Sequence, residues 1–128
     1  MALIVLIDDD ESLRTMLTKM CERLGHEVLA EGNGNLGLKC VRQARPQVVI
    51  TDILMPEKEG VETIMELRRE FPKLKIIAMS GGGRNSASDY LSMARKFGAA
   101  FTLAKPFGRE ELKNALESVL AEPQSPKP

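Results

Sequence analysis

The chain has 128 residues, 43% of them hydrophobic, and its 18 basic residues balance its 18 acidic residues. This length suits one domain with a proper core, and the zero net charge argues against direct nucleic-acid binding, which needs a basic face. No apolar run reaches the roughly 20 residues of a membrane span, and the opening MALIVLIDDD lacks the features of a signal peptide. We therefore expect a cytoplasmic protein with no membrane contact.

Apolar runs alternate with stretches of helical periodicity along the chain. Continuous apolar runs predict buried strands, and apolar residues three or four apart predict amphipathic helices. In chain order we predict a strand at 2–7, a helix with its apolar stripe at 13–24, a strand at 27–31, a helix ending near 44, a strand at 47–53, a helix at 61–71, a strand at 74–80, a helix at 90–97, a strand at 100–104 and a helix at 109–121. The proline-rich residues 122–128 then form a tail or linker, so that the domain spans residues 1–121.

Five strand–helix units in succession predict an α/β domain, a single doubly wound parallel sheet with helices on both faces. Right-handed crossovers leave few arrangements, and the flavodoxin-like strand order 2-1-3-4-5 accommodates five units. Ligands of such sheets bind outside the carboxyl ends of the strands. The polar residues that end the first, third, fourth and fifth strands would meet there: Asp8, Asp9, Asp10, Asp52, Ser80 and Lys105.

Three consecutive aspartates follow the first apolar run, although neighbouring carboxylates repel one another. At about 4 Å the repulsion between two unit charges near a protein surface is roughly 4 kcal/mol. A bound cation and Lys105 would offset this repulsion for Asp8 and Asp9. Asp10, with Glu11 behind it, is better interpreted as the N-cap of the next helix, where the helix dipole favours a carboxylate.

The predicted cluster has a definite chemistry, although each residue alone has a purely structural explanation. Clustered carboxylates without a neighbouring His or Cys suit a hard cation such as Mg²⁺. A carboxylate beside that ion can attack phosphorus, and phosphoryl transfer then needs neutralisation of the phosphoryl oxygens. Lys105 offers a cation, Ser80 a hydroxyl group and the backbone around Gly81 further N–H donors. The set therefore predicts an acceptor of phosphoryl groups.

Four motifs in this order resemble those of response-regulator receiver domains, the CheY-like domains of two-component signalling. They are the Asp8–Asp9 pair, DILMPEKEG at 52–60, MSG at 79–81 and KPF at 105–107. The resemblance covers residues 2–121, nearly the whole chain. It implies a signalling switch rather than an enzyme acting on other molecules.

The resemblance implies a role for each residue of the metal and acceptor site. Asp52 would accept a phosphoryl group from a sensor histidine kinase or a phosphotransfer protein. Mg²⁺ would be held by Asp9, Asp52 and the backbone carbonyl of Leu54, with Asp8 supporting it directly or through water.

The resemblance also implies how the phosphoryl group is bound and read. Ser80 would bond to it, Lys105 would pair with it, and the peptide bond before Pro106 would be cis, as only X–Pro bonds adopt at modest cost. The face made by the predicted helix at 90–97, the strand at 100–104 and the last helix would then change to bind a downstream protein or a second copy. Thr102 stands where the family often has an aromatic residue, with Phe101 one earlier.

Two loop features carry further hypotheses. Neither Leu54 nor Gly82 offers a side chain that could orient an attacking water, which predicts slow self-dephosphorylation. The GGGRNSAS segment at 81–88 is either a lid over the site or a simple surface loop.

Other interpretations of the sequence are weaker. GNGNLG at 32–37 has the spacing of a dinucleotide-binding loop, but it follows the second strand instead of the first; Asn33 or Asn35 would cap a helix there. A phosphohydrolase would need a second carboxylate just after Asp52, where the apolar Ile53 and Leu54 stand. The presence of Asp9, Asp52 and Lys105 argues against a receiver that serves only as a docking module. Cys21 and Cys40 are expected to be buried and reduced, with no zinc-site spacing toward the lone histidine.

Overall fold

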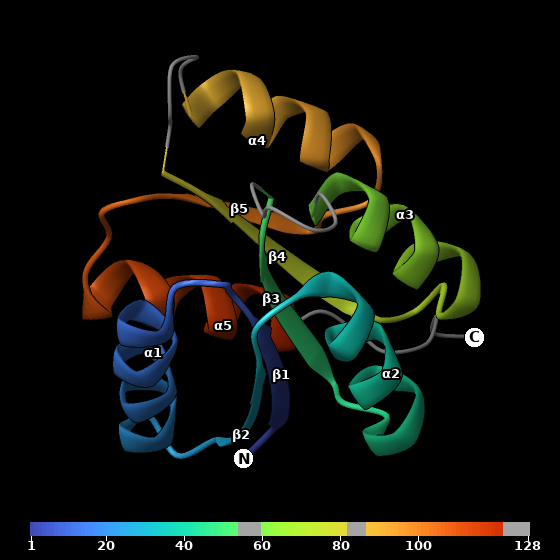
Figure 1. Cartoon of the computed structure of the whole chain (residues 1–128). Coiled ribbons are helices and arrows are strands. Elements are labelled where there is room, and N and C mark those ends of the chain that lie inside the picture. Colours follow the sequence, from blue (N-terminus) through green and yellow to red (C-terminus); the bar gives the residue numbers. More distant parts are fainter. Residues whose placement is uncertain (54–59, 82–86, 122–128) are drawn as a thin grey trace.

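The computed structural model describes residues 1–53, 60–81 and 87–121, with the side chains of 87–91 excepted. Five parallel strands form one sheet in the order β2-β1-β3-β4-β5, with helices on both faces (Figure 1). The elements are β1 (Leu3–Ile7), α1 (Glu11–Arg23), β2 (Glu27–Glu31), α2 (Gly34–Ala44), β3 (Val48–Asp52), α3 (Gly60–Glu70), β4 (Lys75–Ser80), α4 (Ala87–Lys96), β5 (Phe101–Ala104) and α5 (Arg109–Ala121). The predicted fold class and strand order are confirmed.

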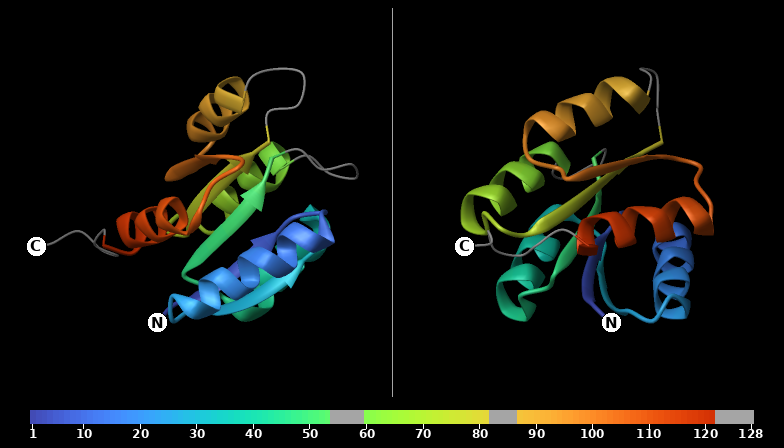
Figure 2. Two further views of the ribbon diagram at one scale, coloured as in Figure 1. Left: turned by 90° about the vertical axis from the view of Figure 1, so that its left-hand side faces the viewer. Right: turned by 180° about the vertical axis from the view of Figure 1, so that it is seen from behind.

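The sheet separates two hydrophobic clusters, because successive side chains of a strand point to opposite faces. On one face, Ile4 and Leu6 pack with apolar residues of α1 and α5. On the other face, Val5 and Ile7 pack with residues of α2, α3 and α4. Figures 1 and 2 show these two helical layers on either side of the sheet. The central strands are covered on both faces, which explains their continuous apolar sequences.

Local signals fix where the first two helices begin. Asp10 is the N-cap of α1, and its Oδ1 accepts a hydrogen bond from the backbone N–H of Leu13 at 3.1 Å. Asn33, one of the two expected candidates, caps α2 by accepting from the N–H of Leu36 at 2.9 Å. In the same GNGNLG segment, a Cβ on Gly37 would lie 2.3 Å from Cδ1 of Ile7. These residues therefore start a helix and let it pack closely on β1, which accounts for the segment without a dinucleotide.

The two cysteines differ in burial. Both are free thiols; Cys21 is buried in the core as expected, but Cys40 is only half-buried at the edge of its cluster. Burial, aided by the charge of nearby Glu22, raises the pKa of the Cys21 thiol to about 11, so it stays protonated at neutral pH. None of the helices in the described part of the chain combines the length and hydropathy that a membrane crossing requires.

Candidate functional site: a carboxylate cluster at the sheet edge

The first two carboxylates of the site come from neighbouring strands. β1 and β3 pair in parallel with Ile7 opposite Thr51, so the residues that follow, Asp8 and Asp52, lie next to each other at the carboxyl edge of the sheet. The side chain of Asp8 is fully buried and that of Asp52 is 8% exposed. Two acidic groups in such a position require a compensating positive charge.

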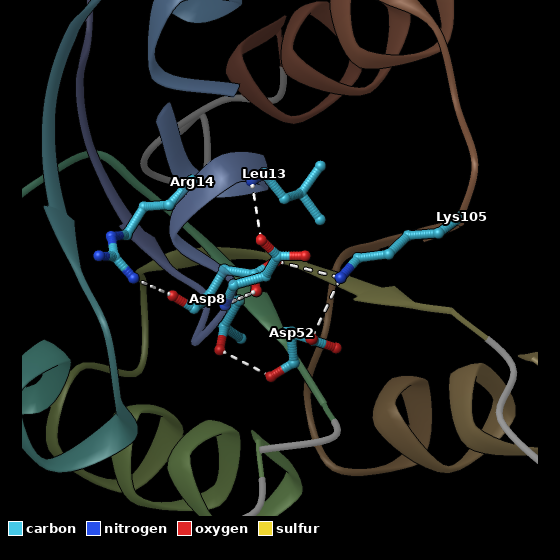
Figure 3. A network of polar contacts seen from close by, with 7 residues as sticks. Asp8, Leu13, Arg14, Asp52 and Lys105 are labelled. Atoms are coloured by element: carbon cyan, nitrogen blue, oxygen red, sulfur yellow. Dashed lines mark hydrogen bonds and ion pairs between the residues drawn. The ribbon is translucent and has the colours of Figure 1, made fainter. Parts of the chain in front are cut away.

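Lys105 supplies that charge from the end of β5. Its Nζ lies 3.1 Å from Oδ2 of Asp8 and 3.1 Å from Oδ2 of Asp52, and Figure 3 shows the side chain reaching across to both. Burial alone would lower the pKa of Lys105, but the charges of Asp52 and Asp8, together with hydrogen bonds to both, raise it above its ordinary value. The ammonium is therefore fully charged at neutral pH and bridges the two carboxylates.

Asp9 adds a third carboxylate on the open side of the cluster. One carboxylate oxygen from each of Asp8, Asp9 and Asp52 lies within 4.8 Å of the other two, and Asp9 is exposed. The donors in this group are oxygen atoms alone, the ligands that Mg²⁺ prefers over softer metals. The residues present therefore fit a hard divalent cation. Leu54, expected to add a backbone carbonyl, lies outside the described residues.

Two contacts hold the loop of Asp8 in place. Its Oδ1 accepts a hydrogen bond from the backbone N–H of Asp10 at 2.9 Å, and its backbone carbonyl accepts one from Nη1 of Arg14 at 2.8 Å (Figure 3). Arg14 is a positioning residue that sequence reasoning missed. It is half-buried in α1 beside the apolar stripe, and nothing in a single sequence distinguishes it from Lys19 and Arg23, the exposed cations of that helix.

Gly60 packs against the backbone of Asp52 and Ile53, and this positioning role is the second that the sequence did not reveal. Its backbone N–H donates to the carbonyl of Ile53 at 3.0 Å. A Cβ at this position would lie 2.0 Å from the carbonyl oxygen of Asp52 and 2.4 Å from Cα of Ile53. Only glycine allows α3 to begin this close to the end of β3. The glycine that ends the DILMPEKEG motif was the available signal.

The other predicted site residues lie at the ends of β4 and β5. Ser80 is buried at the end of β4, and its carbonyl accepts a hydrogen bond from the N–H of Lys105 at 2.8 Å. Gly81 follows beside the Lys105 side chain, since a Cβ there would be 3.7 Å from Cδ of the lysine. The peptide bond between Lys105 and Pro106 is cis. The sheet thus brings Ser80, Gly81 and Lys105 to the same edge as the carboxylates.

The residues of the expected switch lie further along β5. Phe101 pairs with Ile77 and Thr102 with Ala78, so both precede the site-forming end of the strand. Both side chains are half-buried. Most of the GGGRNSAS segment and Gly82 lie outside the described residues.

Comparison with known proteins identifies the family. The model of the response regulator receiver domain matches residues 4–117. The chain belongs to this family. Receiver domains are signalling switches rather than classical enzymes, they typically bind Mg²⁺ at an acidic pocket, and they interact with histidine kinases and downstream effectors. In this chain Asp8, Asp9 and Asp52 form an acidic cluster whose carboxylate oxygens could hold a metal ion.

Individual relatives match nearly all of this chain but differ in how much of their own length the match covers. This receiver domain is 36% identical over 119 residues to the DNA-binding transcriptional regulator NtrC of Azospirillum brasilense, covering 93% of this chain but 24% of that protein. It is 32% identical to protein PilH of Pseudomonas aeruginosa, covering 94% of this chain and 99% of that protein. A receiver domain protein from Clostridium thermocellum has a similar structure, with a TM-score of 0.88, 28% identity, and coverage of 94% and 95% of the two chains. The chain thus spans about a quarter of the NtrC relative and nearly all of PilH.

Proposed function

We propose that the chain is a phosphorylation-controlled switch of a two-component system in the cytoplasm, with Asp52 as the phosphoryl acceptor. The observation that carries the proposal is the contact of Lys105 Nζ with both Asp8 and Asp52 at 3.1 Å. It sets an acceptor carboxylate, a cation and a second acidic ligand within one small cluster. The donor would be a sensor histidine kinase or a phosphotransfer protein.

The proposed transfer moves one phosphoryl group to Asp52. A carboxylate oxygen of Asp52 attacks the phosphorus of a phosphohistidine, an O–P bond forms, and the P–N bond breaks. The electron pair of the broken bond stays on the imidazole nitrogen, which takes up a proton as it leaves. Asp52 is only 8% exposed, so the donor must approach along the edge where Asp9 opens to solvent.

The remaining site residues have supporting roles in this proposal. Asp9 and Asp52, with the Leu54 carbonyl and support from Asp8, would hold Mg²⁺, which when bound neutralises charge on the phosphoryl oxygens. The ammonium of Lys105, which now lies against Asp52 and Asp8, would pair with the phosphoryl group. Ser80 would donate its hydroxyl hydrogen, with the Gly81 N–H beside it.

We propose further that the phosphoryl signal is read on the face formed by α4, β5 and α5. Lys105 follows β5 directly, so a change in its contacts reaches this face through one strand. The face would bind a downstream protein or a second copy of the chain. Since Leu54 and Gly82 carry no polar side chain, we expect slow self-dephosphorylation. A phosphorylated lifetime of only seconds that Leu54→Asn leaves unchanged would contradict that expectation.

The test is incubation of the full chain with Mg²⁺ and a small phosphodonor such as phosphoramidate, followed by intact-mass measurement. We expect the gain of one phosphoryl group, abolished by Asp52→Asn, by Asp9→Ala and by removal of Mg²⁺ with a chelator. Glu11→Gln, which removes a neighbouring exposed carboxylate outside the cluster, is the matched control and should leave the gain intact. No gain, or an equal gain in Asp52→Asn, would reject the acceptor assignment in favour of a docking module.

A further inference from the structure

A groove lies at the opposite edge of the sheet from the carboxylates. It is a groove of about 410 Å³ between two connections, residues 45–47 leading from α2 into β3 and residues 71–74 leading from α3 into β4. Both connections precede their strands, whereas Asp52 ends β3. Five residues of strand separate the two edges, about 16 Å at the usual rise per residue. The groove is therefore distinct from the proposed phosphorylation site.

The groove has an apolar floor and an aromatic wall. Val41, Pro46 and Leu74 are buried beneath it, and the half-buried ring of Phe71 forms one side with Pro72. Its volume falls within the range of roughly 300–1,000 Å³ that is typical of small-molecule sites, which are mostly apolar with a few polar groups.

Arg45 reaches the groove through an unusual backbone conformation. It is the residue after α2 and has φ 52° and ψ 61°, the left-handed region in which glycine is the usual choice at a helix end. In this position its guanidinium carbon lies 5.3 Å from the centre of the Phe71 ring. Its Nε donates to the carbonyl of Arg42 at 3.2 Å, and among the described residues its other four N–H groups have no hydrogen-bond acceptor. The left-handed conformation thus carries the guanidinium of Arg45 over the Phe71 ring at the side of the groove.

The charges around the groove do not balance. Glu70 is its single acidic lining residue, and that carboxylate is already bound by the guanidinium of Arg42, whose Nε donates to it at 2.8 Å. Arg45 and Lys73 also line the groove, and neither has an ion pair within the described part of the chain. The groove thus presents positive charge next to an apolar, aromatic surface.

We propose that this groove binds a small carboxylic acid with a flat apolar body, its carboxylate paired with Arg45 and Lys73 and its body against Phe71. The planar guanidinium suits a carboxylate because it can donate two parallel hydrogen bonds. A partner protein fits less well, because a stable interface buries roughly 800 Å² on each side. Among the described residues, none of the large exposed hydrophobic side chains lines this groove: Met1, Met16, Leu29, Leu36, Met65, Met93 and Phe97.

The test uses naphthoate as the probe and uncharged naphthamide as its matched neutral form. Each is titrated into the isotopically labelled full chain, and backbone amide signals are followed by NMR. We expect naphthoate to shift signals of residues 41–47 and 70–74, with an affinity roughly tenfold above that of naphthamide, as expected for one charge-assisted pair. Equal affinities, or shifts that lie elsewhere, would overturn the proposal, as would binding of a Glu- and Phe-rich peptide without binding of naphthoate.

Variants separate charge recognition from folding. Arg45→Gly, which leaves Lys73 in place, should reduce the preference for naphthoate while keeping the fold, since glycine adopts the same backbone conformation without strain. Arg69→Gln removes a charge from an exposed arginine of α3 that does not line the groove and should leave the affinity unchanged. Asp52→Asn should also leave it unchanged, so that failure of the phosphorylation proposal and failure of this one can be distinguished. An unchanged naphthoate preference in Arg45→Gly refutes the assignment.

Discussion

Replacing Lys105 by methionine tests the electrostatics of the cluster directly. Methionine keeps an unbranched, apolar side chain of similar length, so the change removes the ammonium and little else. The lysine side chain is 17% exposed, and its Nζ contacts a fully buried carboxylate and one that is 8% exposed. The variant therefore leaves Asp8 and Asp52 next to each other without the cation that bridges them.

The expected loss follows from these distances. At 3.1 Å and an effective dielectric constant of about 20, each contact of the ammonium with a carboxylate is worth about 5 kcal/mol of Coulomb energy. Desolvation of the three charged groups offsets much of this, and breaking a buried ion pair by removing one partner costs about 3–5 kcal/mol in practice. We expect Lys105→Met to lower the free energy of unfolding by that amount, a large part of the roughly 5–15 kcal/mol of a typical domain.

The measurement is urea unfolding followed by far-UV circular dichroism, because the chain has no tryptophan and a single tyrosine. Lys96→Met, at an exposed lysine of α4, is the matched control and should change stability little. Adding Asp52→Asn to Lys105→Met should restore part of the loss, since it neutralises one of the two carboxylates. A loss below about 1 kcal/mol, or no recovery in the double variant, would refute a buried bridge and indicate a solvated surface pair.

Three further predictions concern the supports of the site and a distant titrating group. Asp10→Ala should lower the free energy of unfolding by roughly 0.5–2 kcal/mol through loss of a helix cap, yet leave phosphorylation with phosphoramidate intact. Gly60→Ala should lower the free energy of unfolding by about 3 kcal/mol or more and reduce phosphorylation of Asp52, because its Cβ would collide with the backbone there. Gly81→Ala, where a Cβ has room, is the control and should leave the stability unchanged. A Gly60→Ala variant as stable as the parent would contradict the packing. Burial and, less strongly, the N-terminal amine lower the pKa of His26 below 6.5. The contribution of His26 to stability is therefore present above pH 6.5 and is lost as the pH falls through its folded-state pKa. Urea midpoints measured between about pH 7.5 and pH 5 should fall less in His26→Gln than in the parent.

Much of the fold could be predicted because its signals are local. Each strand lies within one residue of its predicted bounds, since Gly, Pro or charged residues mark most ends of the apolar runs. The N-cap role of Asp10 was predictable for the same reason: the cap bond closes within three residues. Placing Asp8, Asp52 and Lys105 at one edge needed one further rule, that parallel strands end on the same side.

Other features depend on contacts between segments far apart in the chain. Arg14 and Gly60 support the cluster through backbone atoms, and backbone approaches leave no pattern in side-chain periodicity. The sequence also did not predict that Cys40 is only half-buried, because periodicity identifies the apolar face of a helix but not how deeply a residue at the edge of that face is buried. The groove beside Arg45 exists only because two connections, 24 residues or more apart, lie next to each other.

The sequence by itself determined the five strand–helix units, their parallel order and the residues that end each strand, because hydrophobic periodicity and capping act over a few residues. Only the tertiary structure decided the distances: which carboxylates share the ammonium of Lys105, how closely α3 approaches Asp52, and where the guanidinium of Arg45 meets the ring of Phe71. Charge interactions and steric contacts change over an ångström or less, and that precision comes from packing the whole chain rather than from any one segment of it.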